Sequence, residues 1–570
     1  MKTIMYRGLK VIILLLCLTG CPNASSSTPP EETPKTVQPF INSSTAYVGD
    51  PVQKVSFEGN ETTKQISIDA LAGHSVFIVK INTSDAAIPY NDTGYAYPSQ
   101  RTPRFQNIAN TNPGASSRFG SFGDTIPLYD HPAAQEFNRN PPPFFPTEQN
   151  SARSVQTEDL APVLPVKGDT KKFWVQDKNN AWQQIDAVLR ETSTHCNVWI
   201  GTENFTTETN NFNDNKLTQV QAQKIAEKFD QIYEYETALF GYEYGGGVPL
   251  SDPTYGGVDK DPKIQILVYD INYDAGVSKD VTLLGYFWGK DYYSQSFLDS
   301  NGYSYKTNLA EIFYIDSFVT DGTPDLTYST LVHEFQHMIN FNEKNIKSDF
   351  RLSPAVWYNE MLSMLAEDMI SPFIGVGYTH QSHPIQQRIP AFLGDYYFKG
   401  VTEWDTKHPL VSYANNYAFG AYLARNYGGP ELVKKIARNN MIDTDSISAA
   451  LSELKGINFK QALNRYGEAF IYSGAHKPAG TVSFDNTVSN TASTVKGFDI
   501  WNQHNIYANT KDIPENYQGP LIWTLDYLFT MPGNSLIVQS LDEWQNITGQ
   551  IPMIVSKPKN SFVDIYIMIR

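Results

Sequence analysis

Residues 329–343 read STLVHEFQHMINFNE and contain the pattern His-Glu-x-x-His at positions 333–337. Two histidines four residues apart lie on one face of a helix, so His333 and His337 can bind a single zinc ion. Glu334 is then placed to take a proton from a water at that metal. On a helical wheel the apolar residues of the stretch gather on one side and the histidines on the other. The stretch therefore predicts a helix that presents a catalytic zinc site to a cleft.

A third metal ligand must come from another part of the chain. Ser353 and Pro354 favour the start of a second helix, as an N-cap residue followed by a first-turn proline. Glu360 and Glu367 are seven residues apart in that helix and so share one stripe. This arrangement suits Glu360 as the third ligand and Glu367 as the partner of a ligand histidine. Glu343, at the end of the first stretch, is the alternative third ligand.

The wider sequence pattern predicts an α+β fold with several parts. Strand-like runs such as residues 264–269 and 311–315 precede a region of helical periodicity from about 325 to 472. We expect a signal peptide at 1–20, a flexible tether at 21–39, an N-terminal β module at 40–97, a Pro-rich irregular linker at 98–165, the catalytic domain at 166–475 and a C-terminal β domain at 476–570.

The N-terminus suggests where the protein works. Residues 1–20 have a basic start and an apolar core that is too short to span a bilayer. They lead into Leu-Thr-Gly-Cys, which resembles the lipobox of bacterial lipoprotein signal peptides. The resemblance implies cleavage before Cys21 and lipid on that residue. We therefore expect a lipid-anchored, extracytoplasmic protein at the outer membrane or cell surface; an ordinary secretory signal is the alternative.

Composition limits the partners. The chain has 570 residues and a formal net charge of −16, which argues against a nucleic-acid partner because phosphates attract basic surfaces. Of the three cysteines, Cys17 leaves with the signal peptide and Cys21 carries lipid. Cys196 then has no partner for an intrachain disulfide, and its apolar neighbours predict a core position. The oligomeric state is not predicted.

The helix around Glu360 also carries a family resemblance. Trp-Tyr-Asn-Glu at 357–360, followed by Glu367, resembles the Trp-x-Asn-Glu…Glu element of gluzincin metallopeptidases. The phrase His-Glu-Phe-Gln-His-Met-Ile-Asn most resembles the hyicolysin family of bacterial neutral metallopeptidases. The resemblance spans about 180–475 and implies a gluzincin-like core flanked by β modules. It also implies one catalytic zinc ion and protein or peptide substrates.

Two further expectations follow from the resemblance. Residues 412–423 are similar to the helix that carries the transition-state tyrosine in aminopeptidase-type gluzincins, which implies Tyr413 as the oxyanion stabiliser, with Tyr417 as the alternative. The resemblance also places an edge strand at 311–316, where an extended peptide would pair. Separately, residues 270–274 resemble the start of a calcium loop, but lack its glycine and final glutamate.

These residues together predict a zinc metalloendopeptidase. Endopeptidase is preferred to aminopeptidase because the Gly-x-Met-Glu-Asn motif that grips a free amine is missing from the sequence. A different class also stays open: a surface-binding lipoprotein, such as an adhesin or scaffold, with a degenerate peptidase core. The complete His333, His337 and Glu360 set argues against that alternative.

Overall fold

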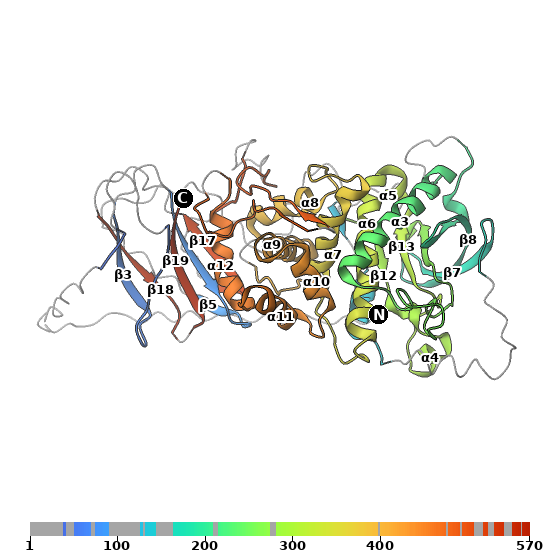
Figure 1. The fold of residues 1–570 in the computed structure, drawn as a ribbon, viewed down its shortest axis with the longest axis horizontal. Coiled ribbons are helices and arrows are strands. Elements are labelled where there is room, and N and C mark those ends of the chain that lie inside the picture. Colours follow the sequence, from blue (N-terminus) through green and yellow to red (C-terminus); the bar gives the residue numbers. More distant parts are fainter. Residues whose placement is uncertain are drawn as a thin grey trace, which may run out of the picture.

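The protein is described by a computed structural model (Figure 1). The structure describes residues 38–41, 51–69, 75–90, 126–128, 131–143, 164–208, 215–273, 281–396, 399–474, 477–490, 493–506, 517–522, 529–540, 550–559 and 561–570. The signal peptide, Cys21 and most of the predicted tether lie outside these residues and stay predictions.

A six-stranded mixed sheet forms one end of the elongated molecule (Figure 1). The strands, in spatial order, are β12 (Gly285–Phe287), β13 (Ile312–Asp316), β10 (Ile264–Tyr269), β9 (Cys196–Gly201), β8 (Trp182–Thr192) and β7 (Thr170–Gln176). β9, β10 and β13 are parallel, and the remaining pairs are antiparallel. The expectation of an edge strand at 311–316 is wrong, because β12 covers β13 and is itself the edge.

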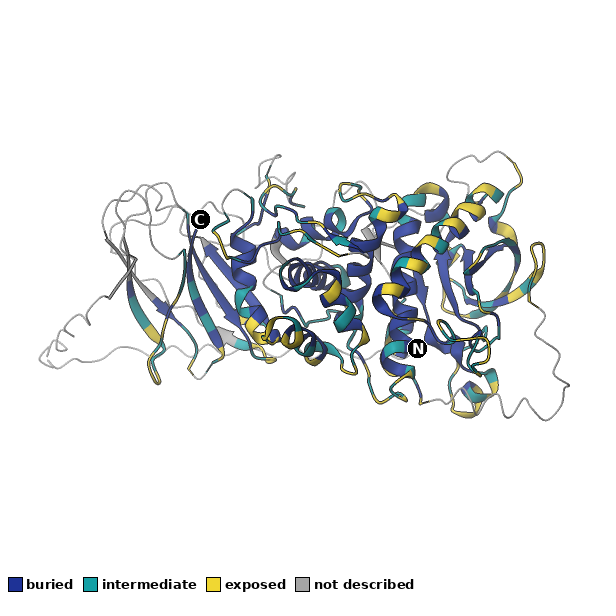
Figure 2. Cartoon of the chain, viewed as in Figure 1, coloured by how far each residue is buried: buried dark blue, intermediate teal, exposed yellow. Residues whose placement is uncertain are grey.

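Two long helices pack on this sheet. α3 (Gln219–Phe240) begins with a capping box in which Thr218 and Gln221 satisfy each other's backbone N–H groups. α6 (Pro324–Asn340) carries the His-Glu-x-x-His motif and lies over β12 and β13. The Phe335 ring on α6 lies 5.0 Å from the Phe229 ring on α3. α6 is therefore enclosed on several sides, which is why it is buried along most of its length (Figure 2).

A helical layer follows α6 along the chain. It contains α7 (Val356–Ile370), α8 (Pro384–Ala391), α9 (Pro409–Tyr427), α10 (Pro430–Arg438), α11 (Asp443–Lys455) and α12 (Phe459–Ile471). α7 lies between α6 and α9 (Figure 1). The predicted helix start at Ser353 is wrong: α7 begins at Val356. Its N-cap is Ala355, and the Ser353 hydroxyl donates to the Arg139 carbonyl.

The far end of the molecule is a β module built from both ends of the chain. One sheet has the order β17 (Ser535–Ser540), β4 (Val76–Asn82), β19 (Val563–Ile569) and β2 (Val52–Lys54). A second sheet contains β1 (Gln38–Ile41), β3 (Thr63–Asp69) and β18 (Gln550–Ser556). The structure thus joins the segments 40–97 and 476–570, which the sequence analysis separates into two modules.

Strand β4 shows how the module is attached. Phe77, Val79 and Ile81 point to the core shared with the helices, and Val79 lies against Gly467 of α12. Val76 and Ile78 point the other way, into a separate small core of the module. This period-two alternation is what a strand buried on both faces requires.

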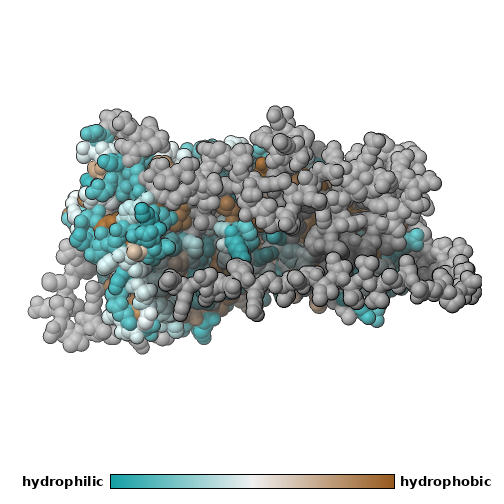
Figure 3. Space-filling view, turned by 180° about the vertical axis from the view of Figure 1, so that it is seen from behind, coloured by the Kyte–Doolittle hydropathy of each residue, from teal (hydrophilic) through white to brown (hydrophobic). Residues whose placement is uncertain are grey.

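The predicted linker 98–165 contains regular structure where it is described. β6 (Ile126–Leu128) pairs in parallel with β11 (Val281–Leu283). α1 (Pro132–Arg139) lies against the catalytic unit. Within the described part of the chain, none of the helices combines the length and apolar character of a membrane span. The coloured surface at the sheet end, seen from behind, is mostly hydrophilic (Figure 3).

Candidate metal centre

Helices α6 and α7 bring the three predicted ligands together. The Glu360 Oε2 atom lies 3.2 Å from His333 Nε2 and 3.7 Å from His337 Nε2. The two imidazole rings are perpendicular, with centroids 4.7 Å apart. All three side chains are buried, and one ligand atom from each falls within 4.8 Å of the others. Among the described residues this is the one group of histidine, cysteine and acidic side chains with such an arrangement.

The group fits a zinc ion in chemistry and size. Zinc binds histidine nitrogen and carboxylate oxygen at about 2.0–2.1 Å, and two ligands at a tetrahedral angle then lie about 3.3 Å apart. The two Nε2–Oε2 separations, 3.2 and 3.7 Å, are close to that value. A site with three protein ligands leaves one position for water or substrate, as catalytic zinc sites do.

Glu367 orients the first histidine. Its Oε1 atom lies 2.8 Å from His333 Nδ1, so it accepts the Nδ1–H and leaves Nε2 facing Glu360. The Ser329 hydroxyl donates to Glu367 Oε2 over 2.7 Å and fixes the carboxylate in turn. The structure thus places Glu367 where the sequence analysis expects it, beside a ligand histidine.

A serine has the corresponding place beside the second histidine. The Ser363 hydroxyl lies 3.0 Å from His337 Nδ1 and donates to Gln336 Oε1 over 2.6 Å. It can therefore accept the Nδ1–H of His337 and leave Nε2 facing Glu360. The sequence analysis misses Ser363; the only available signal is its place one turn after Glu360.

The two histidines have opposite electrostatic environments. Burial lowers the pKa of His333, but the hydrogen bonds and charges of Glu360 and Glu367 outweigh burial and raise it to about 10. Burial lowers the pKa of His337 to about 4, so this ring is neutral. A divalent cation at His333 Nε2 would take the place of a proton there, since metal ligands must be deprotonated.

Two buried acids lie beside this group. Burial raises the pKa of Glu334 to about 8, although a backbone hydrogen bond at Phe287 lowers it in part. Glu236, on α3, is likewise buried with both oxygens unpaired, and burial raises its pKa well above its usual range. Its charge interacts with His333 and Glu367. The sequence analysis misses Glu236, because a polar residue on the buried face of α3 has no local signature.

Glu343, the alternative third ligand, lies elsewhere. α6 continues into a π-helical turn, Phe341–Ile346, that carries Glu343 towards the end of α3. Its Oε1 atom accepts the Tyr242 N–H over 3.2 Å and lies 2.6 Å from Lys347 Nζ. The geometry of the described residues favours Glu360 over Glu343.

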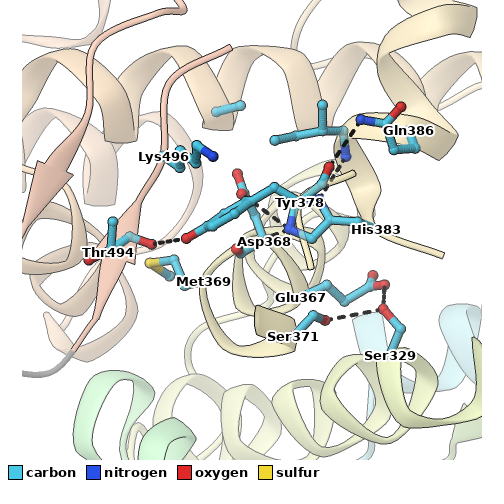
Figure 4. A network of polar contacts seen from close by, with 12 residues as sticks. Ser329, Glu367, Asp368, Met369, Ser371, Tyr378, His383, Gln386, Thr494 and Lys496 are labelled. Atoms are coloured by element: carbon cyan, nitrogen blue, oxygen red, sulfur yellow. Dashed lines mark hydrogen bonds and ion pairs between the residues drawn. The ribbon is translucent and has the colours of Figure 1, made fainter. Parts of the chain in front are cut away.

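The next residue on α7, Asp368, lies beside Tyr378 and His383, whereas Glu367 points towards Ser329 (Figure 4). Asp368 accepts hydrogen bonds from Arg425, at 2.8 and 3.2 Å, and from the Tyr417 hydroxyl at 3.0 Å. His383 Nε2 lies 3.3 Å from its backbone oxygen. α7 therefore uses adjacent acids in opposite directions, Glu367 towards α6 and Asp368 towards α9.

This arrangement bears on the predicted oxyanion tyrosine. The Tyr417 hydroxyl donates to Asp368, which is eight residues beyond Glu360 and hence about 12 Å along α7. The Tyr413 ring packs edge-on against Trp404 and under the Arg388 guanidinium. These described contacts join neither tyrosine to His333, His337 or Glu360, and the oxyanion role stays a prediction.

The predicted calcium loop is only partly described. Residues 271–273 form a short helical turn, and the Ile271 N–H donates to Asp316 Oδ2 over 3.0 Å. Residue 274 lies outside the described part. Calcium binding at this loop stays a prediction.

One contact to Glu360 comes from outside these helices. Gln135 Nε2, on α1, donates to Glu360 Oε1 over 2.7 Å. A small pocket between α1, α6 and α7 reaches His337 and Glu360. The sequence analysis misses Gln135, which it places in an irregular linker.

Comparisons with known proteins agree with the site. The family described as Peptidase M30 matches residues 183–492, which include the motif helix and α7. A neutral metalloprotease of Staphylococcus hyicus, ShpI, is 27% identical over 318 residues, which is 52% of this chain. The aligned region spans 60% of that protein's length. The predicted resemblance to the hyicolysin family is confirmed, and the chain belongs to the Peptidase M30 family.

Proposed function

We propose that this protein is a zinc metalloendopeptidase that hydrolyses extracellular or surface proteins. The observation that carries the proposal is the meeting of His333, His337 and Glu360 with the buried carboxylate of Glu334 beside them. The similarity to a neutral metalloprotease supports the same reaction class.

The chain's own residues have defined tasks in this reaction. His333, His337 and Glu360 would hold a zinc ion, whose Lewis acidity would polarise the scissile carbonyl and make water more acidic. Glu334 takes the proton of the attacking water on a carboxylate oxygen and returns it to the leaving amine. Glu367 and Ser363 hold the two imidazoles in the ligand orientation.

The test substitutes three glutamates one at a time. Glu334→Gln should keep bound zinc, measured by mass spectrometry, and lose nearly all casein cleavage. Glu360→Gln should lose zinc. Glu343→Gln is the matched control, because Glu343 lies on the continuation of α6 and contacts Tyr242 and Lys347. Casein cleavage that survives Glu334→Gln would refute the mechanism, and zinc loss in Glu343→Gln would make Glu343 the ligand.

The same preparation separates the competing functions. Purified protein without stoichiometric zinc would favour the binding lipoprotein with a degenerate core. An endopeptidase cleaves peptides whose termini are both blocked, whereas an aminopeptidase needs a free N-terminus. Cleavage of unblocked peptides alone would therefore reverse the choice of endopeptidase.

We also propose that lipid on Cys21 anchors the protein to a bacterial membrane on the extracytoplasmic side. The support is the lipobox-like sequence before Cys21. Radiolabelled palmitate should enter the wild-type chain and not Cys21→Ser, which should leave the membrane fraction. Equal membrane association of both chains would refute the anchor.

A further inference from the structure

Helix α1 approaches the metal centre from outside the peptidase unit. The family match begins at residue 183, whereas α1 spans Pro132–Arg139. Its side chains nevertheless make some of the closest contacts to the centre. A peptidase has to admit a polypeptide here, so what occupies this place determines whether substrate can enter.

The first contact is to a metal ligand. Glu360 uses Oε2 towards the two histidines, and its other oxygen, Oε1, accepts a hydrogen bond from Gln135 Nε2 at 2.7 Å. Gln135 and Glu360 both line the small pocket that reaches His337. Gln135 therefore stands at the entrance to the metal group.

The second contact is to the edge of the sheet. Asn138 Nδ2 donates to the Phe287 carbonyl over 2.9 Å, and Asn138 Oδ1 accepts the Gly289 N–H at 2.7 Å. One carboxamide thus satisfies a C=O and an N–H two residues apart, as a backbone strand alongside β12 would do. Extended peptides bind proteins by adding to such edges. Asn138 therefore makes the hydrogen bonds to the Phe287 carbonyl and the Gly289 N–H that an added peptide strand would otherwise make.

The remaining contacts hold α1 in this position. The Phe137 ring packs edge-on against Tyr293, Tyr303 and Tyr305. His131 stacks on Trp288, the residue that follows β12, with ring centroids 5.4 Å apart. The candidate catalytic residues are closed off from solvent in this arrangement: His333 is 0% exposed, Glu334 0%, His337 1% and Glu360 1%. A catalytic zinc site, by contrast, needs one position open to substrate.

We propose that α1 is an intramolecular inhibitor that occupies the substrate cleft and must leave before a polypeptide can bind. Gln135 fixes the spare oxygen of Glu360, and Asn138 caps the edge of β12. The inference rests on the proposed function, because it assigns α1 the place of a peptidase substrate. It adds that the chain as described is the closed form.

The main test disables the two contacts in the full-length, zinc-loaded chain. Gln135→Ala, Asn138→Ala and the double variant are compared with Glu136→Gln, a control on the same helix whose side chain is exposed. Two rates are measured: cleavage of casein, as kcat/KM, and release of zinc to a colorimetric chelator. Gln135 is only half-buried, so Gln135→Ala should fold. If Asn138→Ala does not fold, Gln135→Ala alone still tests the proposal.

Both rates should rise together, by about tenfold or more in the double variant. Access of casein and access of the chelator depend on the same fraction of open molecules, so the two factors should agree. The control should change neither rate. A faster zinc release with lower kcat/KM would show instead that Gln135 supports the ligand set, and unchanged rates would show that α1 does not block the cleft. Either result overturns the proposal.

A disulfide that can be reduced provides the opposite test, because it should prevent α1 from leaving the cleft. Ser353 Oγ and Asn140 Oδ1 are exposed neighbours 3.3 Å apart, at the end of α1 and just before α7. In the double variant Asn140→Cys/Ser353→Cys, a disulfide should close α1 on the centre. The oxidised chain should then release zinc more slowly and cleave casein less, and dithiothreitol should restore both rates. Full rates in the verified oxidised form would overturn the proposal.

The two readouts separate this inference from the proposed function. If the α1 variants release zinc faster but no variant cleaves casein, the inference that α1 covers the metal centre is supported and the proposed peptidase reaction is refuted. If the wild type cleaves casein and Glu334→Gln does not, but the α1 variants change neither casein cleavage nor zinc release, the peptidase reaction is supported and the inhibitory role of α1 is refuted.

Discussion

The two ligand histidines are held by different kinds of partner. His333 Nδ1 faces the carboxylate of Glu367 at 2.8 Å, and His337 Nδ1 faces the hydroxyl of Ser363 at 3.0 Å. A carboxylate makes a stronger, charge-assisted hydrogen bond than a hydroxyl and makes the ligand nitrogen more basic. The first histidine should therefore depend more strongly on its partner than the second.

Substituting the partners measures this difference. Glu367→Gln should weaken zinc binding or lower kcat by about 10–100-fold, and Ser363→Ala should have a smaller effect. Zinc competition titration and casein kinetics give the two values. Ser371→Ala is the control, because its hydroxyl contacts Ser329 in the same network. Equal effects of all three substitutions would indicate general loosening of α7 and not histidine orientation.

The tyrosines of α9 give a second prediction. An oxyanion donor is worth about 10²–10³ in kcat, but the described contacts of Tyr413 are with Trp404 and Arg388. We therefore expect Tyr413→Phe to leave kcat nearly unchanged. Tyr417→Phe removes a hydrogen bond to buried Asp368 and should lower the free energy of unfolding by about 1–3 kcal/mol. A large fall in kcat with unchanged KM in Tyr413→Phe would restore its predicted role.

The residues of the centre differ in how visible they are in the sequence. His333, Glu334 and His337 share one local spacing, and Glu360 with Glu367 share another, so pattern alone predicts them. Gln135, Glu236 and Ser363 lie far apart in the sequence, and each is an ordinary polar residue in its own segment. Only the packing of α1, α3 and α7 around α6 brings them beside the proposed metal ligands.

At the level of elements, α7 depends on a close approach of α9. A Cβ atom at Gly420 would lie 2.7 Å from Met361 Cγ and 3.1 Å from Leu365 Cδ1. Gly420→Val should therefore force the helices apart and lower the free energy of unfolding by about 1–3 kcal/mol, measured by urea denaturation. Gly377→Val is the control, because a Cβ there meets nothing within 4 Å. Equal midpoints for the two variants would refute the close-packing argument.

The segment after α3 gives a pH-dependent prediction. Glu243 is buried, its Oε1 accepts from the Tyr233 hydroxyl at 2.9 Å, and its Oε2 has no hydrogen bond. Burial raises the pKa of Glu243 to about 7, and burial likewise raises those of Asp259, to about 7, and Glu311. The folded chain holds these protons more tightly than the unfolded chain does. The contribution of these three groups to stability is thus greatest below about pH 4.5 and falls as pH rises towards and through 7.

Glu243→Gln removes one of these titrations and keeps an acceptor for Tyr233. The variant should be more stable than the wild type at pH 8, by up to about 3 kcal/mol, and equal to it near pH 4. Denaturation midpoints across this range give the comparison. Glu234→Gln, at an exposed position on α3, is the control. A constant difference between Glu243→Gln and wild type at all pH values would exclude the titration of Glu243.

Element positions are predictable where a local signal decides them. β10 occupies the predicted residues 264–269. The start of α7 is missed because its N-cap is Ala355 and not Ser353, whose hydroxyl donates to the distant Arg139 carbonyl. A tertiary contact thus overrides a sound local preference. The same kind of contact turns part of a proline-rich segment into α1.

The whole molecule depends on pairings that no local pattern reveals. β4, near the N-terminus, lies between β17 and β19, near the C-terminus. Each strand is visible in the sequence as a run of β-forming residues, but its partners lie more than 400 residues away. The sequence therefore shows two β segments, and the fold makes one module from them. Since α12 packs on the same sheet, this module also closes the end of the helical layer.

This shared sheet should unfold as one unit. Ile567 of β19 is fully buried and pairs with Ile78 of β4, so Ile567→Asp puts an unpaired charge into the module's core. We expect the β4 amides, Val76–Asn82, to lose protection in hydrogen exchange, while β10 keeps its protection. Asp564→Asn is the control, because it removes only a partly exposed ion pair with Lys54, which contributes little. Protection lost in β19 alone, with β4 unchanged, would show that the two ends of the chain fold independently after all. Loss of protection in β10 as well would mean that the β module and the peptidase unit unfold as one cooperative unit.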